Sequence, residues 1–128
     1  MKIPENLKYT DTHQWVRVDK DGTVVVGITD YAQEQLGDVV FVQLPEAGRK
    51  VKRGETCSVV ESVKAASDIP APISGEVVTV NTALADAPEK LNQEPYVSWL
   101  FRITSAEPAE MTLLLDAATY KSSVKSDG

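Results

Sequence analysis

Short β-branched segments separated by glycine and proline turns run along most of this chain. Segments of this kind, spaced about 8–12 residues apart, are typical of a β-sandwich or barrel. The clearest pair lies on either side of Asp21-Gly22, a strong hairpin turn signal. The predicted strands cover residues 13–18, 23–28, 38–44, 56–63, 66–69, 73–81 and 96–103.

Two helical segments are expected beside these strands. Residues 29–36 predict a short helix with Thr29 or Asp30 as its N-cap and Gly37 directly after its end. The tail at residues 105–124 has helical periodicity up to Leu115, and Asp116 is expected to cap one further turn. Between them, the polar loop at residues 82–95 is expected to hold one helical turn at residues 88–91.

Length and charge limit the function classes. A chain of 128 residues, 42% hydrophobic and 25% charged, predicts a single globular domain over residues 1–128. Nineteen acidic and thirteen basic residues give a formal charge of −6, which argues against nucleic acid or an anionic membrane and favours partners with basic docking faces. No run approaches the roughly 20 apolar residues of a membrane span.

Cys57 is the only cysteine, so an internal disulfide is excluded and a reducing compartment is expected. One cysteine and one histidine cannot form a Cys/His metal cluster. The N-terminal residues have neither the apolar core of a signal peptide nor the composition of a transit peptide, which predicts a cytoplasmic protein. A mature mitochondrial protein without its presequence would have the same features.

Residues 56–69 predict a hairpin with Lys64 at its tip, and no other segment offers comparable chemistry. Only Val63 and the small residues Ala65 and Ala66 flank the lysine, so its ε-amine is open to an enzyme. Gly54 lies ten positions before it and Gly75 eleven after it. Glycine suits positions of positive φ or close backbone approach. A single lysine taken alone would be read as a surface charge.

The residues around Lys64 resemble the lipoyl-attachment motif, and the wider sequence resembles the H-protein family of the glycine cleavage system. The segments that carry this second resemblance are residues 13–15, 27–30, 36–42, 44–46 and 92–99. The resemblance implies a hybrid-motif barrel-sandwich of two antiparallel sheets, with lipoate in amide linkage to Lys64. Glu61, Ser62, Val63 and Ala65 are then the context that a lipoate ligase or octanoyltransferase recognises.

The family resemblance also implies a non-catalytic carrier, expected to be a monomer, that serves three enzymes. A pyridoxal-phosphate decarboxylase, the P protein, loads the lipoyl group with the aminomethyl group of glycine. The T protein transfers the methylene to tetrahydrofolate, and dihydrolipoamide dehydrogenase, the L protein, reoxidises the dithiol. A second role implied for the family is the relay of octanoyl or lipoyl groups in lipoate biosynthesis.

The same resemblance implies a cleft that shelters the loaded arm, with His13, Gln14 and Asp68 as its expected lining. Here the sequence departs from the family, which commonly has glutamate at the position of Gln14. A carboxylate could pair with a cationic amine, whereas the amide offers a neutral hydrogen bond of roughly half the strength. We therefore expect a loaded arm to be held less tightly, unless Asp68 or Glu61 supplies the charge.

Other readings of the sequence are disfavoured by particular residues. A biotin carrier normally has methionine on both sides of its lysine, where this chain has Val63 and Ala65. A lipoyl domain of another multienzyme complex normally reads Asp-Lys-Ala and lacks the helical tail. An unmodified domain that shares only the fold stays open, because fold does not determine function. Cys57 is interpreted as a strand residue rather than a nucleophile, since the sequence places no histidine beside it.

Overall fold

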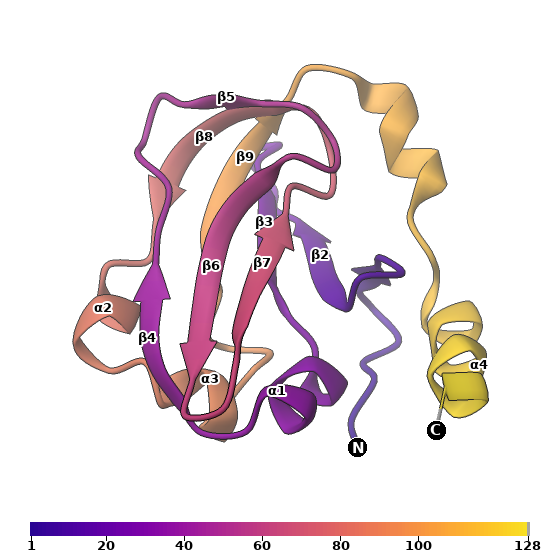
Figure 1. The fold of residues 1–128 in the computed structure, drawn as a ribbon. Coiled ribbons are helices and arrows are strands. Elements are labelled where there is room, and N and C mark those ends of the chain that lie inside the picture. The colour runs from indigo at the N-terminus through magenta and orange to yellow at the C-terminus, as the bar shows by residue number, and fades with distance from the viewer. Residues whose placement is uncertain (128) are drawn as a thin grey trace.

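The computed structural model describes residues 1–127, with side chains as far as residue 124, and consists mainly of two antiparallel sheets (Figure 1). In spatial order, the larger sheet contains β1 (Lys8–Tyr9), β2 (Gln14–Val18), β3 (Val24–Ile28), β9 (Phe101–Ser105), β8 (Gly75–Val80) and β5 (Lys50–Val51). The smaller sheet contains β4 (Val39–Gln43), β6 (Thr56–Ser62) and β7 (Ala66–Pro70). The predicted fold class is confirmed.

One hydrophobic core fills the space between the sheets. Val26 and Ile103 of the larger sheet and Val60 and Ile69 of the smaller sheet are at most 3% exposed. Burial of each such side chain stabilises the fold by roughly 1.5–3 kcal/mol. Because side chains alternate along a strand, the other face of β6 and β7 lies in solvent.

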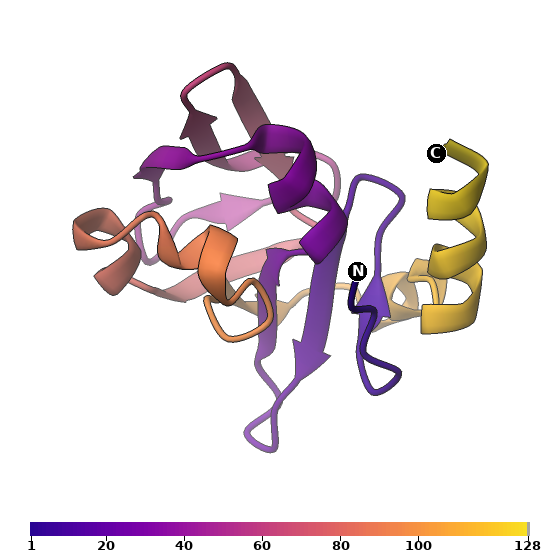
Figure 2. The ribbon, with the colours of Figure 1, turned by 90° about the horizontal axis from the view of Figure 1, so that it is seen from below.

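Three short helices, α1 (Asp30–Leu36), α2 (Ala83–Asp86) and α3 (Lys90–Gln93), cover the end of the sandwich at which β6 turns into β7 (Figure 2). Thr29 is the N-cap of α1, since its Oγ1 accepts a hydrogen bond of 3.2 Å from the backbone N–H of Ala32. Asn92 of α3 accepts from the N–H of Val39 at 2.9 Å and donates to the carbonyl of Gly37 at 2.8 Å. These bonds fix the end of α1 against the start of β4.

The C-terminal tail forms two separate helices, where the sequence predicts one helical segment and one further turn. A 3₁₀-helix, η1 (Pro108–Leu113), precedes α4 (Ala117–Asp127). The Asp116 carboxylate accepts from the N–H of Thr119 at 2.8 Å, so the predicted cap is present, but α4 is longer than expected. Tyr120 of α4 is buried and stacks on Tyr9 of β1 with 4.7 Å between ring centroids. This contact holds α4 beside the N-terminal strands (Figures 1 and 2).

The predicted strand at residues 96–103 is wrong in its first half. Residues 94–98 form a tight turn in which the N–H groups of Val97 and Ser98 both donate to the carbonyl of Glu94, at 3.1 and 2.9 Å. The carbonyl of Pro95 accepts from the Trp15 indole at 2.9 Å. The strand begins only at residue 101, because the local turn and the long-range bond from Trp15 override the apolar pattern. Also unpredicted were β1, β5 and a second helix in the loop at residues 82–95.

The two glycines that flank the hairpin are needed for different reasons. Gly54 has φ of +88°, the left-handed region that costs other residues roughly 1–2 kcal/mol. Gly75 packs against β9, and a Cβ there would lie 2.1 Å from the carbonyl oxygen of Thr104. Both reasons, positive φ and close backbone approach, match those expected from the sequence.

Candidate functional site

Lys64 lies exposed in the turn between β6 and β7, as the sequence predicts. The turn is closed by Ser62, whose N–H donates to the Ala65 carbonyl at 2.7 Å. The Ser62 hydroxyl oxygen accepts from the N–H of Ala65 at 3.1 Å and from that of Lys64 at 3.3 Å. The N–H of Val63 donates to the Asp38 carbonyl at 3.0 Å, which ties the turn to the segment between α1 and β4. The backbone that carries the lysine is therefore held from both sides.

Gly37, just after α1, lies beneath the Lys64 side chain. A Cβ on Gly37 would be 3.3 Å from Cε of Lys64 and 3.9 Å from its Nζ. The glycine also has φ of 78° and ψ of −156°, a conformation that is essentially restricted to glycine. The bare backbone lets the lysine stem lie across the end of α1 with its amine exposed.

We expect Ser62→Ala to loosen this turn without unfolding the protein. The substitution removes the only side-chain acceptor for the N–H groups of Lys64 and Ala65 in the described residues, which should lower the free energy of unfolding by about 1 kcal/mol. Hydrogen exchange of those two amides, measured together with urea unfolding, checks the result. Ser62→Thr should restore slow exchange, and Ser67→Ala is the matched control on β7. Equal exchange in Ser62→Ala and wild type would contradict this role for the hydroxyl.

A cleft of about 280 Å³ begins directly beside the lysine. One wall is β7 and the turn before it, and the opposite wall comes from α1, the end of β3 and the segment before β2. The lining residues are Thr12, His13, Gln14, Ile28, Ala32, Gln35, Leu36, Ala65, Ala66, Ser67 and Ile69. The lining is mostly apolar with a few polar groups, so the cleft suits an aliphatic chain that ends in a polar group. Gln35 was not predicted, although its position three residues after Ala32 on α1 places both on one helix face.

Gln14 is 1% exposed, and both the oxygen and the nitrogen of its amide group are hydrogen-bonded. Its Oε1 accepts hydrogen bonds from the hydroxyls of Thr10 at 2.7 Å and Thr12 at 2.6 Å. Its Nε2 donates to the Thr12 carbonyl at 2.6 Å. The amide oxygen, which the sequence reading offered to a cationic amine, is already taken by two hydroxyl groups.

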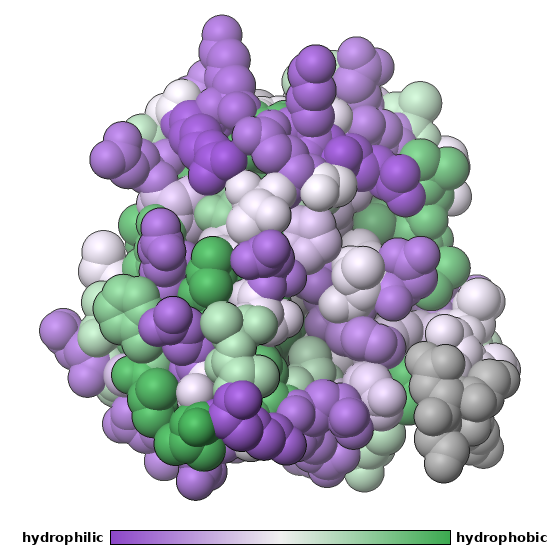
Figure 3. All heavy atoms as spheres, in the orientation of Figure 1, coloured by the Kyte–Doolittle hydropathy of each residue, from purple (hydrophilic) through white to green (hydrophobic). Residues whose placement is uncertain are grey.

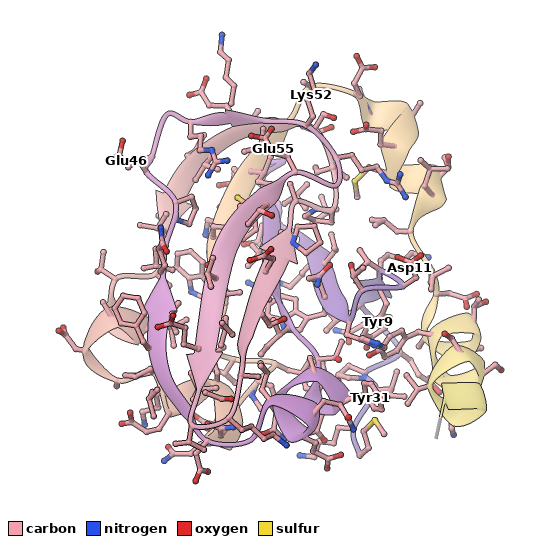
Figure 4. All side chains as sticks on the ribbon, viewed as in Figure 1. Tyr9, Asp11, Tyr31, Glu46, Lys52 and Glu55 are labelled. Atoms are coloured by element: carbon pink, nitrogen blue, oxygen red, sulfur yellow. The ribbon has the colours of Figure 1, made fainter. Side chains whose placement is uncertain are left out.

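His13 connects the cleft to the C-terminal helix. Its φ of 70° is the only positive value of a non-glycine residue in the described part of the chain, and such strain is common at functional sites. Nδ1 lies 2.9 Å from the Tyr120 hydroxyl, which is 2.7 Å from Oγ1 of Thr29, the cap of α1. The imidazole also packs against Tyr31, labelled in Figure 4, with 4.6 Å between ring centroids. Sequence reasoning missed Tyr120, because no local pattern connects residues 107 positions apart.

Asp68 does not line the cleft, contrary to expectation. On β7, Ser67 and Ile69 turn toward the cleft and the core, so the alternation of the strand directs Asp68 to the solvent face. Glu61 is also exposed, on β6 opposite Ala66, and likewise does not line the cleft. Among the expected residues, only His13 and Gln14 meet in the cleft, beside the end of the hairpin.

Other chemistry is scarce in the part of the chain that the structure describes. Burial raises the pKa of the Cys57 thiol to about 11, so almost no thiolate exists at neutral pH. Among the side chains described, which reach residue 124, no group of three or more from histidine, cysteine, aspartate or glutamate could hold a metal ion. No described helix is long and apolar enough to cross a membrane.

Comparison with known proteins identifies the family. The model of the glycine cleavage H-protein family matches residues 7–127. The chain belongs to this family. Glycine cleavage system H protein 2 of Pseudomonas aeruginosa is 55% identical over 126 residues, with 98% of each chain covered. The H protein of Halorhodospira halophila is 58% identical over 128 residues, which cover 99% of this chain and 98% of that protein.

A solved structure supports the same assignment. The crystal structure of a glycine cleavage system H protein from Mycobacterium marinum has a TM-score of 0.82 and 44% identity, and covers 92% of this chain and 95% of its own. The family that the sequence resembles is thus confirmed. As a glycine cleavage H protein, the chain is a lipoyl carrier of that system.

Proposed function

We propose that Lys64 carries the lipoyl group in amide linkage and that the neighbouring cleft shelters the arm. The observation that carries this proposal is the position of one exposed lysine on a braced turn, directly beside a mostly apolar cleft of about 280 Å³. The cleft fits an aliphatic arm, because Ile28, Leu36 and Ile69 give it apolar walls. When bound, the lipoyl group supplies a disulfide that accepts a carbon group and two electrons.

The chain's own residues orient the lysine and shelter the arm. Ser62 fixes the direction of the turn, and Gly37 leaves room for the lysine stem. His13 and Gln14 belong to the polar part of the cleft and are held there by Tyr120, Thr10 and Thr12. This arrangement supports a carrier that performs no catalysis itself, because the one cysteine is buried with a raised pKa.

The partners proposed are the P, T and L proteins, together with a lipoate ligase or octanoyltransferase. An excess of acidic residues supports brief docking on basic enzyme surfaces, since complementary charge raises association rates. We further propose that residues 1–128 act as one carrier domain, as a monomer and in the cytoplasm. The bacterial origin of the relatives and the single cysteine support that location.

The test is the intact mass of protein produced with a lipoate ligase, in cells fed with lipoate and in cells deprived of it. We expect one lipoyl adduct per chain in fed cells only, and peptide mapping should find it on the fragment that contains Lys64. An unmodified protein in fed cells, or an adduct on another lysine, would refute the proposal.

A further inference from the structure

Two consecutive apolar side chains of the edge strand β4 face solvent. Val40 is 54% exposed and Phe41 52%, while Val39 and Val42 on either side are buried. The cause is a β-bulge: Val39 pairs with Ser62 and Phe41 with Glu61, so Val40 is an extra residue. Bulges redirect side chains in this way and are over-represented at sheet edges and active sites. Regular alternation along a strand would leave only one of two neighbouring residues in solvent. The bulge is therefore what exposes both Val40 and Phe41.

These side chains adjoin the turn that carries Lys64. Phe41 lies directly opposite Glu61, one strand spacing away, or about 5 Å. Val63, next to the lysine, is 69% exposed, and its N–H is bonded to the Asp38 carbonyl just before β4. We call Val40, Phe41 and Val63 the tip patch. Figure 3 shows hydrophobic atoms gathered on this face over β4 and the adjoining end of the molecule, among hydrophilic ones.

Two carboxylates border the tip patch on the outer face of the smaller sheet. Glu61 lies between Phe41 and Ala66 in the strand register, and Asp68 lies opposite Val59, the next outward residue of β6. Neither forms an ion pair among the described residues. Their charge is therefore available to cations of a partner. Asp68, which does not line the cleft, thus lies within reach of a partner on this outer face.

We propose that the tip patch, with Glu61 and Asp68, is the docking surface of the enzyme that acylates Lys64. That enzyme would present an apolar contact bordered by lysine or arginine side chains. The inference rests on the proposed attachment at Lys64. It extends the surface that the attaching enzyme recognises from the motif residues Glu61 and Val63 to Val40, Phe41 and Asp68. In the reaction, a bond forms between Nζ and the acyl carbon of an adenylate or thioester donor. The bond from that carbon to its leaving group breaks, and the amine loses a proton to a base.

Geometry favours this enzyme over the later partners. Before modification, the acceptor is a lysine amine only one side chain from the hairpin backbone. The acylating active site must come that close, so its surface necessarily covers the residues beside the turn. Later partners receive a much longer arm and can dock farther away. Phe41 is the expected anchor of the contact, because aromatic residues at the centre of an interface often dominate binding.

Acylation kinetics of the unmodified protein test this surface, with a purified lipoate ligase, lipoate and ATP. For Phe41→Ser, and for the double variant Val40→Ser/Val63→Ser, we expect the KM for the protein to rise about tenfold, with kcat nearly unchanged. Glu61→Lys/Asp68→Lys should raise KM by a similar factor, and its deficit relative to wild type should shrink as salt is added, because salt screens charge. Thermal unfolding of each variant verifies that it is folded.

Two matched controls lie outside the tip patch. Val97→Ser changes a valine that is 68% exposed in the loop after α3, and Glu46→Lys reverses a charge beyond the far end of β4, as Figure 4 shows. Both should keep the wild-type KM. The inference is overturned if the patch and charge variants keep the wild-type KM. It is also overturned if the KM of the controls rises as much as that of the patch and charge variants. Failure of the wild type to accept any lipoyl group would instead refute the attachment at Lys64.

Discussion

A Lys64→Arg variant is expected to carry no lipoyl or octanoyl adduct under conditions in which the wild-type chain is fully modified. The guanidinium group stays protonated in proteins and is not a nucleophile toward an acyl donor. It keeps the positive charge and can lie across Gly37 as the lysine does. Because Lys64 is exposed, the free energy of unfolding should change by less than about 0.5 kcal/mol. Intact mass and urea unfolding measure the two effects.

The matched control is Lys52→Arg. Lys52 is also exposed and is labelled in Figure 4 at the end of the molecule opposite the hairpin turn. This variant should be modified as fully as wild type. An adduct that persists in Lys64→Arg would show that another lysine is the acceptor, while loss of the adduct in both variants would point to a general effect of arginine.

Local chemistry explains why the position of Lys64 could be predicted. Three features depend only on contacts between residues a few positions apart: the turn around Lys64, the cap at Thr29 and the turn at Asp21-Gly22. Patterns of this range are visible in a single sequence. The turn between β6 and β7 therefore lies where its β-branched arms and small tip residues predict it.

Long-range contacts explain what the sequence did not reveal. His13, which lines the cleft, is hydrogen-bonded to Tyr120, and no periodicity relates residues from opposite ends of the chain. Asp68 was assigned to the cleft from family resemblance, but one step of strand alternation directs it to the other face. The bulge at Val40 shifts that alternation in β4. The bulge is a feature of the pairing between β4 and β6, which the residues of β4 alone do not reveal.

Gln14→Glu is expected to destabilise the unmodified protein by about 3 kcal/mol at neutral pH, the typical cost of a buried charge without a partner. A glutamate could keep the two bonds from the hydroxyls of Thr10 and Thr12. Its second oxygen, however, would face the Thr12 carbonyl at about the present 2.6 Å, with no proton between the two oxygens. A carboxylate at this position needs a neighbouring cation to offset its charge, whereas the neutral amide needs none.

The effect should depend on pH in a defined direction. Burial and the facing carbonyl both raise the pKa of a carboxyl group at this site above its ordinary value of about 4.3. The folded variant then binds more protons than the unfolded chain, so its stability falls as pH rises above that value. Below about pH 4 the protonated acid can donate to the Thr12 carbonyl, and the deficit should disappear. Urea unfolding of variant and wild type at pH 4 and pH 7 measures the difference.

Gln35→Glu is the matched control, since Gln35 lines the same cleft but is exposed. It should cost less than about 0.5 kcal/mol at either pH. A loss of stability in Gln14→Glu that is equal at both pH values would contradict the proposed clash with the Thr12 carbonyl.

In the lipoylated protein, a glutamate at position 14 should retain a cationic amine in the cleft longer than glutamine does. An unchanged release rate would mean that Gln14 does not determine how tightly the loaded arm is held.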